Sequence, residues 1–253
     1  MQESSEKDLP QQSARRSAKL EMRLAIGLAG AAATLAIDAP KAQSHRRDFP
    51  FTYDWYQPVK GEKELELKSR YRGRDASFQQ QIEFEYGVSD RLVIAPYVVF
   101  ERGRGENLRY AEVKLESRYQ LGKFKTNRIL PSLYLEYARP RSGAGELEGK
   151  LILSRFNKKG DNLSLNLIAE RELASGAEIE REYSIGYARD LGRKGARIGA
   201  EWIHNLTDKR INAGPTIAFS ATKDIWLVTG YAFPISGRGN RGEFRLLLEY
   251  EWS

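Results

Sequence analysis

The chain has 253 residues and no cysteine, and 41 Lys and Arg against 34 Asp and Glu leave a net charge of +7. The absence of cysteine excludes disulfides, thiolate metal sites and cysteine nucleophiles. The body of the chain contains no run of about 20 apolar residues, which excludes a bundle of membrane-spanning helices. Basic residues are interleaved with Glu, without a basic helix or an aromatic platform, so we expect no nucleic-acid binding.

Residues 1–44 have the features of a signal peptide, which begins at Met1 or, as the alternative start codon, at Met22. Leu24–Ile37 is apolar but too short for a spanning helix, and a small-x-small pattern at Ala42–Ser44 offers a cleavage site. Four basic residues precede the apolar run: Arg15, Arg16, Lys19 and Arg23. The alternative is a buried or anchoring helix of a soluble protein. We expect residues 45–62 to form a periplasmic segment between the signal peptide and the first strand.

From residue 63 to residue 253, apolar and polar residues alternate in short segments separated by turns. The pattern predicts about twelve strands, each near the length that a tilted strand needs to cross a bilayer. An even number of strands is typical of bacterial outer-membrane barrels. The expected strands are 63–72, 78–88, 91–101, 108–121, 129–138, 146–156, 161–172, 178–189, 195–206, 211–221, 224–234 and 243–252. The pattern is weakest in the tenth and eleventh.

Alternation does not show which face of the sheet lies inside. A soluble barrel or sandwich would bury its apolar face, whereas a transmembrane barrel turns that face toward lipid. Three features favour the membrane: the export signal, aromatic residues near strand ends, and a final strand that carries Phe244, Tyr250 and Trp252 on one face. The expected fold is therefore all-β, a single antiparallel up-and-down transmembrane barrel in a bacterial outer membrane.

Two segments carry a resemblance to a known family. The first is Phe51–Trp55 followed by Lys60–Leu67, and the second is Glu83–Leu92, which contains the turn Tyr-Gly-Val-Ser-Asp-Arg. Residues 50–253 resemble transporter-like barrels grouped with the phenol-degradation-pathway outer-membrane proteins. The resemblance implies an outer-membrane barrel with a transport role and no defined substrate. The sequence departs from the usual pattern at its end, because Ser253 follows the aromatic Trp252.

The polar faces of the strands predict the lining of the lumen. We expect an acidic wall with fewer basic residues, and hence a preference for cations. The turns at 102–107, 140–145 and 236–242 are too short to fold inward as a plug, so selectivity should come from the wall alone. The predicted pore-lining residues are Glu83, Glu85, Glu112, Lys114, Glu116, Arg118, Glu136, Lys150, Glu170, Glu180, Glu182, Arg197, Glu201, Arg245 and Glu249.

Catalysis is not expected. Beyond the predicted cleavage site only His45 and His204 remain, and no serine follows His204 on the same strand face, as a barrel hydrolase would need. Glutamates two residues apart occur on any polar strand face, so we predict no metal site and no cofactor.

The sequence predicts a passive channel or transporter-like barrel for small polar solutes or ions. Its expected partners are outer-membrane lipid and the barrel-assembly machinery, which would engage the C-terminal strand. Two alternatives remain open: a closed structural or adhesive outer-membrane barrel, and a soluble periplasmic ligand-binding β protein. The sequence does not predict the oligomeric state.

Overall fold

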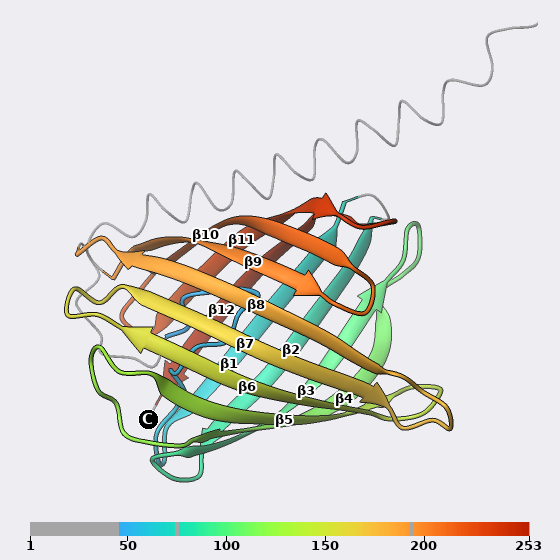
Figure 1. Ribbon diagram of the computed structural model, residues 1–253. Helices are drawn as coiled ribbons and strands as arrows, with labels where there is room; N and C mark the ends of the chain where they lie inside the picture. Colours follow the sequence, from blue (N-terminus) through green and yellow to red (C-terminus); the bar gives the residue numbers. More distant parts are fainter. Residues whose placement is uncertain (1–45, 74–75, 193–194, 253) are drawn as a thin grey trace, which may run out of the picture.

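Twelve antiparallel strands close into a single barrel in a computed structural model that describes residues 46–73, 76–192 and 195–252 (Figure 1). Each strand pairs with its neighbours in sequence, and β1 pairs with β12 to complete the ring. The predicted fold class is confirmed. The predicted signal peptide, residues 1–44, lies outside the described residues. No helix in the described part of the chain is long and apolar enough to cross a membrane.

The strands begin and end within two residues of the predicted positions. Two pairings contain an irregularity, at Val99–Phe100 between β3 and β4 and at Ile211–Asn212 between β10 and β11. The second lies where the alternation was weakest. The strands are β1 Lys63–Arg72, β2 Ser77–Gly87, β3 Leu92–Arg102, β4 Arg109–Gln120, β5 Leu130–Pro140, β6 Glu146–Phe156, β7 Asn162–Glu172, β8 Ile179–Asp190, β9 Arg197–Asn205, β10 Arg210–Ser220, β11 Ile225–Ser236 and β12 Glu243–Trp252.

The apolar face of the sheet lies outside. On β2, Ile82 and Phe84 are 39% and 38% exposed, whereas Glu83 and Glu85, which alternate with them, are 1% and 2% exposed. The other strands follow the same rule, with exposed Leu, Ile, Val and Tyr around the barrel. A barrel with this outer surface suits lipid rather than water. This orientation argues against the soluble alternative, which would bury its apolar face.

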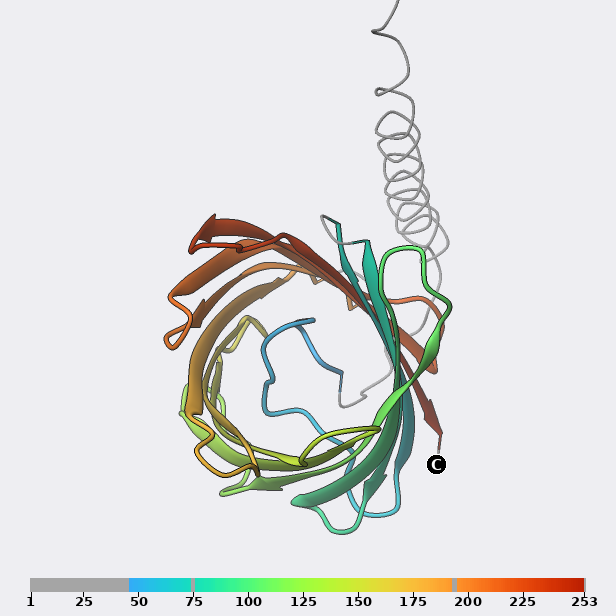
Figure 2. The same cartoon turned by 90° about the vertical axis from the view of Figure 1, so that its right-hand side faces the viewer.

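Residues 46–59, which we call the luminal segment, lie within the barrel (Figure 2). We expected this stretch on the periplasmic side of the barrel and expected no plug. The segment is rich in aromatic residues, and the lumen gives them a site away from water: Phe49 is 0% exposed and Trp55 is 4% exposed. A turn with Gly61 in the left-handed region (φ +86°) then joins the segment to β1.

Candidate functional site: the barrel lumen

All fifteen side chains predicted to line a pore lie on the lumen side of the wall, in two groups. Eight line an open cavity in the half of the barrel away from the start of β1 and the end of β12. They are Glu112, Lys114, Glu136, Lys150, Glu170, Glu180, Glu182 and Arg245. The other seven lie in the half that the luminal segment occupies, which we call the closed half. They are Glu83, Glu85, Glu116, Arg118, Arg197, Glu201 and Glu249. Their role in passage of solutes remains a prediction.

Wall side chains bind the backbone of the luminal segment. The Glu201 carboxylate on β9 accepts hydrogen bonds from the amides of Phe51 and Thr52, at 3.0 and 2.6 Å. The Asn166 side chain on β7 accepts one from the Tyr53 amide at 2.7 Å and donates one to the Tyr53 carbonyl at 2.8 Å. A buried backbone without secondary structure needs such partners. These bonds therefore fix an irregular chain inside the lumen.

The start of the segment is anchored by charge. Arg197 at the beginning of β9 forms an ion pair with Asp48 at 2.8 Å, and Asn162 on β7 donates to the same carboxylate at 2.7 Å. Burial raises the pKa of Asp48 to about 7, against the opposing effect of Arg197. Burial also raises the pKa of the neighbouring Asp54. Two carboxyl groups thus meet in the closed half, with Arg197 beside one of them.

Apolar contacts also hold the luminal segment against the wall. Trp55 packs in a buried cluster with Leu130 on β5 and Phe156 on β6. Gly186 on β8 leaves room for Phe49, because a Cβ there would lie 2.8 Å from the Phe49 ring. Gly230 on β11 does the same for Pro50, whose Cγ would lie 2.9 Å from an added Cβ. The wall is therefore shaped to fit the segment.

Ion pairs fill the closed half, and one of them, between Arg47 and Glu66, joins the segment to the wall. Arg47 binds Glu66 at 2.9 Å, and Lys68 binds the other oxygen of Glu66 at 2.8 Å. Arg118 binds both Glu85 and Glu116. A buried carboxylate needs such a partner to remain charged.

Two groups of three carboxylates are close enough together to hold a cation: Glu64, Glu66 and Glu85, and Glu83, Glu85 and Glu116. Each group includes carboxylates that are already paired with Lys or Arg. The pairs occupy the place that a metal would take, and we assign no metal there.

The open cavity has a volume of about 630 Å³, and Phe51 and Tyr53 of the luminal segment form part of its lining. Its charges are nearly balanced, with eight basic and seven acidic side chains. The acidic excess predicted for the wall is therefore not found here. It lies in the closed half, where Glu64, Glu66, Glu83, Glu85, Glu116, Glu201 and Glu249 are buried.

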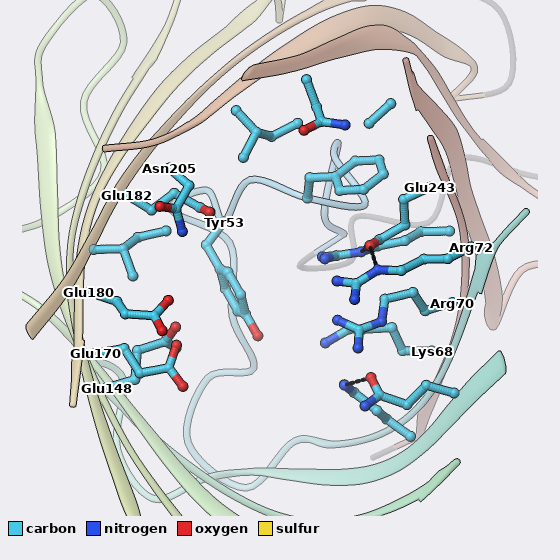
Figure 3. A pocket seen from close by; sticks show the side chains of 18 of the residues that line it. Tyr53, Lys68, Arg70, Arg72, Glu148, Glu170, Glu180, Glu182, Asn205 and Glu243 are labelled. Carbon is cyan, nitrogen blue, oxygen red and sulfur yellow. Dashed lines mark hydrogen bonds and ion pairs between the residues drawn. The ribbon is translucent and has the colours of Figure 1, made fainter. Parts of the chain in front are cut away.

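The charges of the cavity are separated across the lumen. Glu148, Glu170, Glu180 and Glu182 gather on one wall, from β6, β7 and β8 (Figure 3). Lys68, Arg70 and Arg72 of β1 project from the opposite wall, and Tyr53 lies between the two. A solute in this cavity therefore meets opposite charge on its two sides.

Sequence analysis missed the residues that close the lumen, above all Phe49, Tyr53 and Trp55. A signal was present, because Phe49–Tyr56 contains five aromatic residues and would be poorly soluble if exposed. Burial of this stretch could have been predicted, but not its place in the lumen. Alternation also could not reveal Tyr97, which points into the cavity from a strand that is apolar on both faces.

Comparison with models of known protein families finds no match, and no curated protein matches the sequence. Among solved structures, the KdgM porin in complex with disordered oligogalacturonate is similar, with a TM-score of 0.55, 11% identity, and coverage of 75% of this chain and 99% of that one. The NanC porin has a TM-score of 0.56 and 11% identity, covering 74% and 100%. An outer-membrane channel from Pseudomonas putida F1 has a TM-score of 0.55 and 12% identity, covering 80% and 98%. At these identities the similarity shows a shared barrel fold.

Proposed function

We propose that this protein is an outer-membrane barrel that lets small polar solutes or ions cross passively through its lumen. The observation that carries the proposal is the cavity of about 630 Å³, lined by fifteen charged side chains inside a barrel whose outer surface is apolar. A volume of about 300–1,000 Å³ is the size that accommodates small-molecule ligands. The solved porins and channel with the same fold support this assignment.

The luminal segment forms the narrow part of the proposed path. Solutes would enter the open cavity and then pass the acidic closed half, so we expect cations to be preferred. Passive exchange needs no reacting group, and we propose no enzymatic activity.

Conductance across a planar lipid bilayer tests the proposal. Protein purified in detergent should migrate faster on SDS gels unboiled than boiled, which identifies folded barrel, and should then give discrete current steps. In a salt gradient, the reversal potential should indicate cation preference. Folded barrel that gives neither current nor swelling of liposomes in small sugars or amino acids would contradict a channel. An anion-selective potential would contradict the selectivity alone.

A closed structural barrel is the second candidate, and a specific observation favours it. Residues 47–58 are buried except for Phe51 and Tyr56, which are half-buried, and they contact strands around the ring. If this segment never leaves its seat, the lumen stays closed. Folded barrel without conductance, which gains conductance when the segment is replaced, would support this candidate.

We also propose that the protein belongs with the phenol-degradation-pathway group of outer-membrane barrels. The support is the Tyr86–Leu92 motif, which forms the turn between β2 and β3. The Ser89 hydroxyl accepts hydrogen bonds from the amides of Arg91 and Leu92, and a Cβ at Gly87 would lie 1.9 Å from the Val59 carbonyl oxygen. The motif thus shapes the turn and the approach of the luminal segment. Detection of intermediate sequences that link the chain to that group would test the grouping.

Export and assembly are part of the same proposal. Residues 1–44 would direct export, and the strand Glu243–Trp252 would engage the barrel-assembly machinery and lipid. Mass spectrometry of protein taken from outer membranes should then find an N-terminus after Ala42 or Ser44. An N-terminus at Met1 or Met22 would contradict cleavage.

A further inference from the structure

We propose that the open cavity binds dipolar solutes, which carry a cationic and an anionic group at opposite ends. Glu170, Glu180 and Glu182 would receive the cationic end, and Arg70 the anionic end. This inference deepens the proposed channel function, because it names the class of solute that the path would select.

The topology places the two charged walls opposite each other. In a closed ring of twelve strands, five strands lie between β1 and β7 in either direction, so these two strands face each other across the lumen. Arg70 lies on β1, and Glu170 lies on β7. The neighbouring strand β8 carries Glu180 and Glu182 on the same wall as Glu170 (Figure 3). The separation of charge therefore follows from the order of the strands.

The acidic wall belongs to a row of five glutamates in register across β4 to β8: Glu116, Glu136, Glu148, Glu170 and Glu180. Like charges that lie directly opposite each other on neighbouring strands are destabilising unless a counter-charge is near. Arg118, Lys114 and Lys150 supply that charge to the first three, each with an N–O distance of 2.8 or 2.9 Å.

The end of the row differs. Among the residues that the structure describes, no Lys or Arg nitrogen lies within 4.0 Å of the carboxylates of Glu170, Glu180 or Glu182. These three carboxyl groups line the cavity without a basic partner of their own. A mobile cationic group could supply what the wall lacks.

On the basic wall, the positively charged side chains outnumber their acidic partners. Arg72 and Arg245 share one carboxylate, that of Glu243, at 2.7 and 2.6 Å. Arg70 lies beside Arg245 in the β1–β12 register and, within the described residues, forms no ion pair. A guanidinium in this position presents several N–H donors that match a carboxylate or a phosphate.

The arrangement selects for charge at both ends of a solute. A simple anion would gain from Arg70 but meet repulsion from the glutamates, and a simple cation would meet the reverse. A dipolar molecule gains at both walls, and its apolar middle can lie along Tyr53, which projects between them (Figure 3). Amino acids, short peptides and ω-amino carboxylates have this chemistry.

Isothermal titration calorimetry on the detergent-solubilised full-length protein tests the inference. The probes are 6-aminohexanoate, hexanoate and hexylammonium, which share one chain length and differ in their charged ends. We expect 6-aminohexanoate to bind at least tenfold more tightly than either singly charged probe, and to weaken as salt is added. Equal affinity for all three would overturn the inference.

Two variants test which side chain binds the anionic end of the probe and which binds the cationic end. Arg70→Gln should weaken binding of 6-aminohexanoate roughly tenfold without weakening that of hexylammonium, whereas Glu182→Gln should weaken binding of 6-aminohexanoate without weakening that of hexanoate. The matched controls are Arg128→Gln and Glu178→Gln, which make the same changes at exposed positions in turns. Variants that bind 6-aminohexanoate like their controls would overturn the assignment. A variant that loses binding of every probe would show disruption of the fold instead. Arg70→Lys and Glu182→Asp, which keep the charge, would then test the assignment: restored binding of 6-aminohexanoate would support it, and absent binding would overturn it.

Binding and passage are measured separately, so the two proposals can fail separately. Preferential binding of 6-aminohexanoate by folded barrel that gives no current would contradict the channel and retain the site. Current without preferential binding would retain the channel and contradict the site.

Discussion

Small residues on the lumen face decide how the luminal segment sits. On β8, Ser184, Gly186 and Ala188 point inward and are buried, and Gly186 is the position against which the Phe49 ring packs. On β11, Gly230 receives Pro50 in the same way. The segment and the wall thus have complementary shapes, as in a packed protein interior.

Gly186→Val should displace the segment. The added side chain meets the Phe49 ring, and overpacking of this kind costs about 1–3 kcal/mol. Trypsin should then cut after Arg47, which is 3% exposed in the seated segment, roughly tenfold faster than in the unchanged protein. Gly149→Val is the control, because its nearest neighbouring atom would lie 4.0 Å away. Equal cleavage in both variants would show that Gly186 does not seat the segment.

Ionisation of Asp48 should make the position of the luminal segment inside the barrel less stable as pH rises. It faces Arg197 on β9, Asn162 on β7, and Asp54 within the segment. In the seated segment its pKa is raised from 3.8 to about 7, so between these values the seated state binds more protons than the free state. The stability of the seated state then falls as pH rises through this window, by at most about 1.4 kcal/mol per pH unit, and it levels off above the window.

Conductance at pH 5 and pH 8 measures this effect. The unchanged protein should conduct more at pH 8, where the segment is less firmly held. Asp48→Asn should reduce the difference, whereas Asp90→Asn, at an exposed turn position, should keep it. A difference of equal size in all three proteins would place the titrating group elsewhere.

The elements of this chain divide between a regular wall and an irregular segment. Every strand makes its hydrogen bonds to its neighbours, so its position follows from local alternation and turns. The luminal segment has no strand partner, and side chains of the wall bind its backbone, among them Glu201, Asn166, Gln120 and Trp226. It is therefore the element that can leave while the barrel stays closed.

Replacing residues 47–57 by a Gly-Ser sequence of equal length should open the lumen. The substitute has no aromatic side chains to bury, and the wall charges left behind can be hydrated by water. We expect a severalfold increase in conductance with heat-modifiable migration retained. The control replaces the exposed turn 103–107 in the same way. Unchanged conductance would mean that the segment does not obstruct the path.

The whole molecule depends on one contact between distant parts of the chain, the pairing of β1 with β12. Ten residue pairs join these strands, from Lys63 with Trp252 to Arg72 with Glu243. Closure leaves no free strand edge, and in lipid an open edge would have unsatisfied backbone groups. Phe84 and Tyr250 lie near Trp252 at this seam, with ring centroids 5.9 and 5.5 Å from it.

A cysteine pair tests closure directly, since the chain has no cysteine of its own. Ser69 and Leu246 are register partners across the seam, so Ser69→Cys with Leu246→Cys should oxidise to a disulfide. Thr229 pairs with Leu246 on the next strand, so Ser69→Cys with Thr229→Cys places the thiols two strands apart, about 10 Å, and should stay reduced. Electrophoresis without reductant separates the two results. Failure of the first pair to form would contradict a closed ring.

The sequence by itself determined the strands. Their positions agree with the structure to within two residues, because alternation and turn residues are local signals that a barrel wall follows directly. It also separated the polar from the apolar residues of each strand, so that the fifteen predicted lumen residues all lie on one side of the wall. Only the tertiary structure decided which side is inside, because alternation is the same for either arrangement.

The luminal segment and the division of charge were beyond sequence reasoning for a different reason. The contacts of Thr52 with Glu201 and of Arg47 with Glu66 join residues through the lumen rather than along the sheet, and no periodicity encodes them. The opposition of Arg70 to Glu170 depends on how many strands close the ring. Local pattern fixes each strand, whereas the content of the lumen is fixed only when the ring has closed around it.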